Sequence, residues 1–135
     1  MTHILLVEDS STDAFLIQEA LRQAAFEHTI EVVTDGIAAL ERLRTGTRPD
    51  LVLLDLNLPR KDGREVLAEV KSDPELRSIP VIVLTTSSAP PDVAFAYKHH
   101  ANSYVRKPLG LDRLVESAAA IRDFWVRTAT LPSQA

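Results

Sequence analysis

Short apolar runs recur along the chain, and longer stretches of a different periodicity separate them. The clearest run, at residues 51–54, is apolar at every position and ends abruptly at Asp55. Because this run is too short for a helix and too apolar for a half-exposed strand, it predicts a strand that is buried on both faces. Further strands are expected at residues 3–7, 31–34, 81–84 and 103–105.

Between these runs, apolar residues recur at spacings of three and four, which is the pattern of a helix with one buried face. The first such stretch follows Ser10, Ser11 and Thr12, whose residue types favour the N-cap position. The last and longest stretch repeats from Leu111 to Trp125. Other helices are expected in the segment that ends near Gly46, at residues 64–72, and after Pro90-Pro91.

Strands and helices therefore alternate five times, which predicts an α/β fold with a parallel sheet covered by helices on both faces. Right-handed crossovers would place the carboxyl ends of all strands at one edge of this sheet. Open α/β sheets bind their ligands at that edge. The polar residues that follow the expected strands are Glu8, Asp9, Asp55, Thr85 and Lys107.

Three carboxylates that meet at one edge, from Glu8, Asp9 and Asp55, repel one another, and one of them would stay protonated without a cation. Mg²⁺ suits such a site because it takes oxygen ligands and typically combines one or two protein carboxylates with phosphate oxygens. A carboxylate can also act as a nucleophile and form an aspartyl phosphate. Lys107 would then neutralise the transferring phosphoryl oxygens, and Thr85 would donate a hydrogen bond to one of them.

Each of these residues has a more ordinary interpretation when it is considered alone. Asp55 could cap a turn or a helix, and Glu8 and Asp9 could favour the positive end of the first helix. Ser10 can cap that helix without a charge, so the two acids exceed what capping needs. The hydroxyl expected after the fourth strand could also come from Thr86.

Composition restricts the class of protein. The 135 residues are 45% hydrophobic and 25% charged, which is ordinary for one globular domain, and leave no room for a separate output domain. A net charge of −4 gives no basic surface for nucleic acid, and the absence of cysteine excludes disulfides and cysteine metal sites. No apolar run could span a membrane and no signal peptide begins the chain, so a cytoplasmic protein is expected. We expect the domain at residues 1–129 and a flexible C-terminal tail at residues 130–135.

Four motifs lie in order on the expected elements: the acid pair Glu8-Asp9, DLNLPRKDG from Asp55, PVIVLTT with Thr85, and SYVRKP with Tyr104 and Lys107. Together they resemble the receiver domain of two-component response regulators, over nearly the whole chain. The resemblance implies a flavodoxin-like, doubly wound parallel sheet of five strands in the order 2-1-3-4-5, with five helices.

The same resemblance implies a role for each site residue. Asp55 would accept a phosphoryl group from the phosphohistidine of a sensor histidine kinase, and Lys107 would contact that group. Mg²⁺ would be bound by Asp9, by Asp55 and by the backbone carbonyl of Asn57, with Glu8 in support. The chain would be a signalling protein that catalyses its own phosphorylation and dephosphorylation, not a conventional enzyme.

A switch is also implied by the resemblance. Thr85 would move toward the phosphoryl group and Tyr104 would turn inward into the vacated space, although an aromatic residue in a short buried strand is also an ordinary core residue. The negative charge added by the aspartyl phosphate would bias this two-state switch of Thr85 and Tyr104. The face built from the fourth helix, the fifth strand and the fifth helix would carry the signal. Receivers usually have a cis bond after the conserved lysine, so the bond between Lys107 and Pro108 is expected to be cis.

A narrower resemblance rests on residues 72–108 and on IRDFWVRTATLP at residues 121–132. Both stretches are similar to single-domain response regulators that serve bacterial phytochromes, whose extended last helix often accompanies a homodimer. The adjacent aromatic residues Phe124 and Trp125 cannot both face one core, so one of them is expected to pack on a second copy through the C-terminal face. Alternatively, Trp125 covers the end of the core and Phe124 is partly exposed.

Other functions can be compared with this one. A phosphohydrolase of the haloacid dehalogenase type also uses an aspartyl phosphate after a buried strand, but it needs a second acid where this chain has Asn57. A phosphate-independent adaptor would usually have lost one of the acids or the lysine, and this chain keeps all of them. The role of an intermediate in a phosphorelay stays open, because residue spacing does not distinguish it from a regulator that binds a target.

Overall fold

The computed structural model describes residues 1–134, and Gln134 by its backbone alone. These residues form one sheet whose strands are all parallel, in the order β2-β1-β3-β4-β5. The predicted doubly wound order is thereby confirmed, with the first strand beside the third and the second strand at one edge. The strands are β1 (Thr2–Val7), β2 (His28–Val33), β3 (Leu51–Leu54), β4 (Val81–Thr85) and β5 (Ser103–Arg106).

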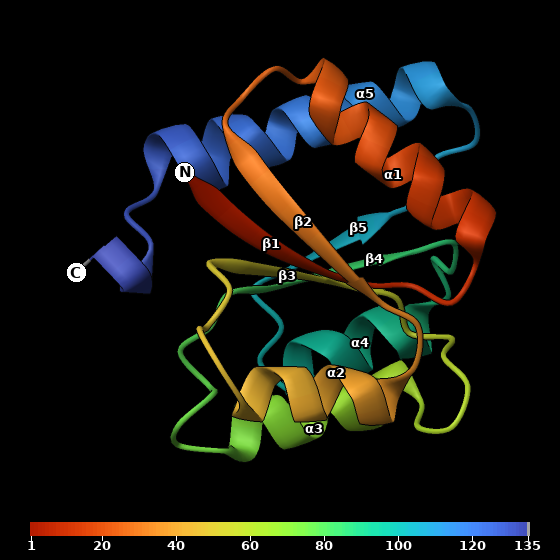
Figure 1. Ribbon diagram of the computed structural model, residues 1–135. Helices are drawn as coiled ribbons and strands as arrows, with labels where there is room; N and C mark the ends of the chain where they lie inside the picture. The colour runs from red at the N-terminus through yellow and green to blue at the C-terminus, as the bar shows by residue number, and fades with distance from the viewer. Residues whose placement is uncertain (135) are drawn as a thin grey trace.

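Helices cover both faces of the sheet (Figure 1). The helices α1 and α5 lie against one face, and α2, α3 and α4 lie against the other. None of the helices within residues 1–134 is long and apolar enough to cross a membrane. The helices are α1 (Ser11–Gln23), α2 (Gly36–Arg44), α3 (Gly63–Ser72), α4 (Pro90–Lys98) and α5 (Leu111–Ile121), and α5 continues into η1 (Arg122–Thr128).

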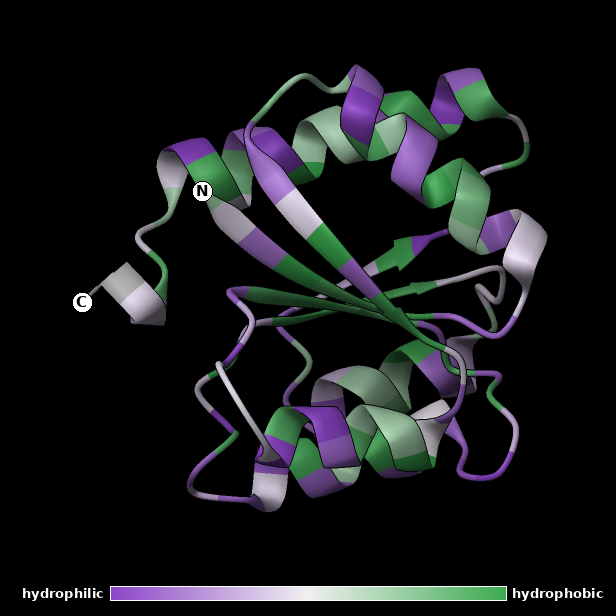
Figure 2. Cartoon of the chain, in the orientation of Figure 1, coloured by the Kyte–Doolittle hydropathy of each residue, from purple (hydrophilic) through white to green (hydrophobic). Residues whose placement is uncertain are grey.

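Each face of the sheet buries its own apolar cluster. Because successive strand residues point to opposite faces, Leu51 and Leu53 of β3 pack under α1 and α5, while Val52 and Leu54 pack against the other helices. All four side chains are at most 2% exposed. Figure 2 shows hydrophobic central strands between helices that carry both hydrophobic and hydrophilic residues. The apolar run at residues 51–54 is therefore the doubly buried strand that the sequence predicts.

Side chains at the ends of the strands fix where the helices begin. The hydroxyl oxygen of Ser10 accepts a hydrogen bond of 3.1 Å from the backbone N–H of Asp13 and caps α1. Asp35 and Asp62 cap α2 and α3 in the same way. Three helices therefore begin at the carboxyl edge of the sheet, and in each of them a loop side chain accepts a hydrogen bond from one free N–H group of the first turn.

The loop after β3 returns very close to the strand it leaves. The backbone N–H of Gly63 donates to the carbonyl oxygen of Leu56 at 2.8 Å. A Cβ atom at position 63 would lie 2.2 Å from the carbonyl oxygen of Asp55, which is closer than any side chain tolerates. The absence of a side chain at Gly63 therefore lets the loop pack against the end of β3 and hold Asp55 in place.

The C-terminal segment differs from the expectation. Beyond Ile121 the helix continues in the wider π-helical geometry as far as Thr128. Leu131 then packs in the cluster under α1 and α5 with 2% of its surface exposed, and the hydroxyl of Ser133 bonds to Asp50. The core therefore extends past residue 129, where the sequence predicted the domain to end, and the segment expected to be a flexible tail begins with a buried anchor. Residue 135 of that tail lies outside the described residues.

Candidate functional site

The carboxyl edge of the sheet brings together five of the residues that the sequence singles out. Glu8 and Asp9 follow β1, Asp55 follows β3, Thr85 ends β4, and Lys107 follows β5. Four of these side chains are almost completely buried, and Asp9 is the exposed member. Since the strands are parallel, residues separated by up to 99 positions along the chain meet at this edge.

Lys107 is the centre of the site. Its Nζ atom donates to Glu8 Oε1 at 2.6 Å, to Asp13 Oδ2 at 2.9 Å and to Asp55 Oδ2 at 3.3 Å. An ammonium group has three N–H donors, so these three carboxylates use all of them. Lys107, which was expected at the same edge as Asp55, therefore contacts it, although it lies closer to its two other partners.

The second oxygen of Asp55 has a different set of partners. The hydroxyl of Thr85, which is fully buried, donates to Asp55 Oδ1 at 2.8 Å. The backbone N–H of Asn57 donates to the same oxygen at 3.3 Å, and the Asn57 side chain is exposed beside the site. Thr86, the alternative hydroxyl, is exposed instead of facing the carboxylate. The two oxygens of Asp55 are thus held separately, one by a hydroxyl and one by an ammonium group.

Burial and charge shift the protonation of the two innermost groups. Burial raises the pKa of Glu8 to about 7, although its hydrogen bond with Lys107 opposes that shift. Burial alone would lower the pKa of Lys107, but the hydrogen bonds to Glu8 and Asp13 and the charge of Asp55 raise it above its ordinary value. Lys107 therefore stays protonated, and the burial of Glu8 makes a further cation at the site favourable.

Glu8, Asp9 and Asp55 form a potential metal site. Each offers one carboxylate oxygen, and these oxygens lie within 4.8 Å of one another. Oxygen-only ligands of this kind suit Mg²⁺. With Asp13, four carboxylates lie at this edge, and the ammonium group of Lys107 contacts three of them, those of Glu8, Asp13 and Asp55. A divalent ion therefore also fits the charge of the edge.

Tyr104 lies at the same end of the sheet but does not bind Asp55. Its hydroxyl donates to the backbone carbonyl of Ser87 at 2.7 Å, in the loop between β4 and α4, and its ring packs against the core. The hydroxyl of Ser87 in turn donates to Asp92 at 2.6 Å, and Arg64 of α3 pairs with the same carboxylate. The loop that follows Thr85 is therefore tied to α3, α4 and β5.

The peptide bond between Lys107 and Pro108 is trans, as are all the other peptide bonds within residues 1–134. The expectation of a cis bond is therefore wrong for this structure. The trans isomer is favoured by about 0.5–1 kcal/mol even before proline. With the trans bond, the Lys107 side chain still reaches Glu8 and Asp55.

Asp13 is the site residue that the sequence did not reveal. It lies in the first turn of α1, where an acid is common because it favours the positive end of a helix. That ordinary role conceals its contact with Lys107, which is 94 residues away along the chain. The signal that was available is its position, because the helix begins directly after β1 and so points its first turn at the carboxyl edge.

The comparisons with known proteins agree with this geometry. The family model described as the response regulator receiver domain matches residues 4–119. Response regulator Rcp1 of Synechocystis sp. is 47% identical over 136 residues, which cover 96% of this chain and 92% of Rcp1. The crystal structure of Mn²⁺-bound Rcp1 matches with a TM-score of 0.90 over 98% of this chain and 99% of that one.

Two further solved structures are similar. The phosphorylated cyanobacterial phytochrome response regulator RcpA is 49% identical, with a TM-score of 0.91 over 97% of this chain and 98% of RcpA. The receiver domain of the sensor histidine kinase PA1611 from Pseudomonas aeruginosa, with a magnesium ion coordinated in its active-site cleft, is 28% identical. Its TM-score is 0.74 over 93% of this chain and 97% of that domain.

Proposed function

This chain belongs to the response regulator receiver family, and from that premise we propose that Asp55 accepts a phosphoryl group from a sensor histidine kinase in a Mg²⁺-dependent reaction. The observation that carries the proposal is the environment of Asp55. One carboxylate oxygen lies 3.3 Å from the ammonium nitrogen of Lys107 and the other lies 2.8 Å from the hydroxyl of Thr85. Hydrogen-bond donors of this kind stabilise a phosphoryl group during its transfer.

In the proposed reaction, a carboxylate oxygen of Asp55 forms a bond to phosphorus. The bond between phosphorus and the imidazole nitrogen of the kinase phosphohistidine breaks, and the nitrogen keeps the electron pair. Lys107 and Thr85 donate hydrogen bonds to the phosphoryl oxygens. Hydrolysis reverses the attachment, because water adds to phosphorus and the Asp55 carboxylate leaves with the release of inorganic phosphate. The chain is thus a signalling protein that catalyses its own modification.

The metal ligands that we propose are Asp9, Asp55 and the backbone carbonyl of Asn57, with Glu8 in support. Mg²⁺ bound there would supply positive charge to the phosphoryl oxygens. The exposure of Asp9 leaves a side of the site open to solvent, from which a donor could approach.

We further propose that Thr85 and Tyr104 transmit the phosphorylated state. Thr85 connects Asp55 to the end of β4. Two residues after Thr85, the backbone carbonyl of Ser87 accepts a hydrogen bond from the hydroxyl of Tyr104. If Thr85 moves toward a phosphoryl oxygen, the loop that Tyr104 holds must adjust. The change would then reach the surface formed by α4, β5 and α5.

The proposed kinase partner is a phytochrome in the cytoplasm. RcpA, which is 49% identical to this chain, is described as a phytochrome response regulator. This chain would therefore act as a single-domain response regulator. No basic surface for nucleic acid is expected from the net charge of −4.

The first test is phosphorylation by a small donor. After incubation with acetyl phosphate and Mg²⁺, intact mass spectrometry is expected to show one added phosphoryl group. EDTA is expected to slow its appearance by at least about tenfold, because the charge at the transferring oxygens is no longer offset. An adduct that forms equally fast with EDTA would contradict the metal requirement, and no adduct at all would contradict the proposed function.

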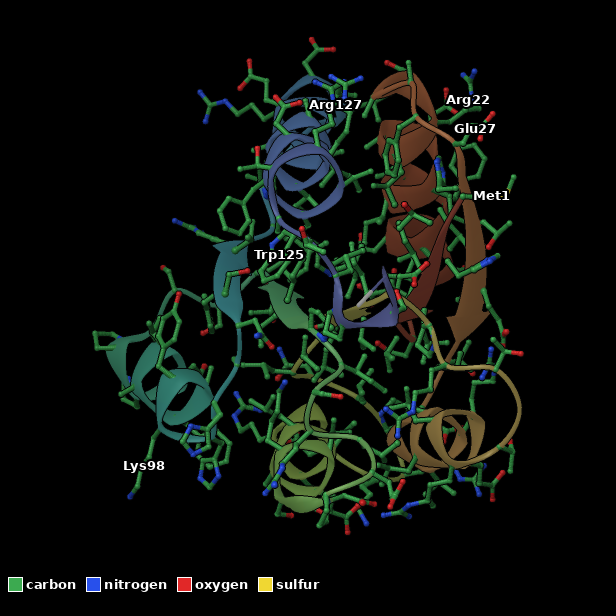
Figure 3. The ribbon with its side chains drawn as sticks, turned by 90° about the vertical axis from the view of Figure 1, so that its left-hand side faces the viewer. Met1, Arg22, Glu27, Lys98, Trp125 and Arg127 are labelled. Atoms are coloured by element: carbon green, nitrogen blue, oxygen red, sulfur yellow. The ribbon has the colours of Figure 1, made fainter. Side chains whose placement is uncertain are left out.

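We also propose a homodimer through the C-terminal face. Trp125 points from η1 toward the sheet and packs against the core, whereas the neighbouring Phe124 is 54% exposed (Figure 3). Phe124 lines a surface groove of about 430 Å³ together with Val105 and Ala120. An exposed aromatic side chain beside such a groove is typical of an interface anchor.

Replacing Phe124 with glutamate is expected to convert the dimer to a monomer, because a charge would be buried at the centre of the interface. Light scattering coupled to size-exclusion chromatography would measure the mass. The matched control is Phe15→Glu, since Phe15 is also exposed but lies on α1. A native chain that is monomeric both with and without phosphorylation would contradict the proposed dimer.

A further inference from the structure

Asp13 contacts Lys107, and the usual roles of an acid at the start of a helix, which are capping and a favourable interaction with the helix dipole, do not explain this contact. Its carboxylate lies 2.9 Å from Lys107 Nζ and retains 37% exposure, whereas the side chains of Glu8 and Asp55 are 1% and 9% exposed. Its backbone is fixed, because its N–H donates to the hydroxyl of Ser10. Asp13 therefore reaches the buried lysine from the rim of the site.

The two shorter contacts of Lys107 hold it from two different elements. Glu8 follows β1 and Asp13 belongs to α1, and their oxygens lie at 2.6 Å and 2.9 Å from the ammonium nitrogen. The contact with Asp55 is the longest, at 3.3 Å. Because the three N–H donors are all in use, a phosphoryl oxygen can gain one only if a carboxylate gives it up. The contact with Asp55 is the one that attachment of phosphorus would replace.

We propose that Asp13 is a positioning residue for the phosphoryl transfer to Asp55, and that it acts through Lys107. With Glu8, it holds the flexible lysine side chain so that one N–H is presented to the incoming phosphoryl oxygens. This inference rests on the proposed function of Asp55. A lysine that is already held in place loses less conformational freedom when the transfer occurs, and the reaction gains in rate.

Asp13 can be changed without removing a proposed metal ligand. The carboxylates that lie within 4.8 Å of one another are those of Glu8, Asp9 and Asp55, and Asp13 is not among them. The rival explanations are that Asp13 only stabilises the start of α1, or that its charge repels an anionic donor. The first leaves the transfer rate unchanged on substitution, and the second raises it.

The test measures the rate of phosphorylation by acetyl phosphate with Mg²⁺ present. Asp13→Ala is expected to lower this rate about tenfold, and Asp13→Asn less, because the amide oxygen still accepts a hydrogen bond. The control is Asp112→Ala, which removes the exposed acid from the first turn of α5. In a Lys107→Met background, Asp13→Ala is expected to have no further effect, since both changes remove the same interaction.

A second readout needs neither metal nor donor. Proton exchange between the Lys107 ammonium group and water, measured by NMR, is expected to be faster in Asp13→Ala than in the native chain and in Asp112→Ala. Any one of three results would overturn the inference about Asp13 but leave the proposed function of Asp55 intact. These are an unchanged or faster transfer rate in Asp13→Ala, an equal loss of rate in the Lys107→Met background, and unchanged proton exchange at Lys107. A native chain that gains no phosphoryl group would overturn the proposed function and the inference together.

Discussion

Asp55→Asn is expected to show no phosphoryl group by intact mass under conditions that modify the native chain completely. The amide is close in shape to the carboxylate, and its oxygen can still accept the hydrogen bond from Thr85. It has no negative charge, however, and does not attack phosphorus. The loss of adduct would therefore reflect the chemistry of one atom and not a change of fold.

The same variant is expected to remain folded. Removing the charge of Asp55 reduces the repulsion among the three carboxylates that lie together, so the thermal midpoint without metal should be at least that of the native chain. Asp112→Asn is the matched control, because it makes the same exchange on the exposed first turn of α5. An adduct of native size in Asp55→Asn would exclude Asp55 as the acceptor.

Lys107→Met is expected to destabilise the metal-free chain by about 3 kcal/mol, because it leaves buried carboxylates without their cation. The side chains of Glu8 and Asp55 are 1% and 9% exposed and would face each other with no ammonium group between them. Methionine approximates the length of the lysine stem, so little packing is lost. Urea denaturation without metal, compared with the native chain, gives the difference in the free energy of unfolding.

Mg²⁺ is expected to recover much of this loss. A metal that no longer competes with an ammonium group binds more tightly, and tighter binding stabilises the folded state more at a given concentration. Added Mg²⁺ should therefore raise the stability of Lys107→Met more than that of the native chain. Lys98→Met is the control, since Lys98 extends into solvent from the end of α4 (Figure 3). Equal stabilisation of both chains by Mg²⁺ would show that Lys107 and the metal do not share these carboxylates.

Much of the fold could be predicted because its decisive features are local. The apolar run at residues 51–54 is sufficient to identify a doubly buried strand, and the alternation with helices leads to the parallel sheet. Strand ends that share an edge then predict the meeting of Glu8, Asp55 and Lys107. Each step uses only neighbours along the chain and the fixed handedness of the connections.

What could not be predicted depends on contacts between distant segments. Asp13 looks like any acid at a helix start until the side chain of Lys107 is placed beside it. Leu131 is a single apolar residue in a polar stretch, so no periodicity marks it as part of the core. The change from α- to π-helical geometry after Ile121 is equally hidden, because a spacing of three to four residues does not show how wide the turn is.

The anchored C-terminal segment has a consequence for inserting this domain into another protein. Ser133 bonds to Asp50, which directly precedes β3, and Asp55 directly follows that strand. At the rise of an extended strand, Asp50 and Asp55 are about 17 Å apart. The chain begins on the same side of the molecule (Figure 1). A host protein that received this domain as a loop insertion would join it at two nearby points, both remote from Asp55. The carboxyl edge of the sheet, which holds Asp55, would then face away from the host and stay accessible to other proteins.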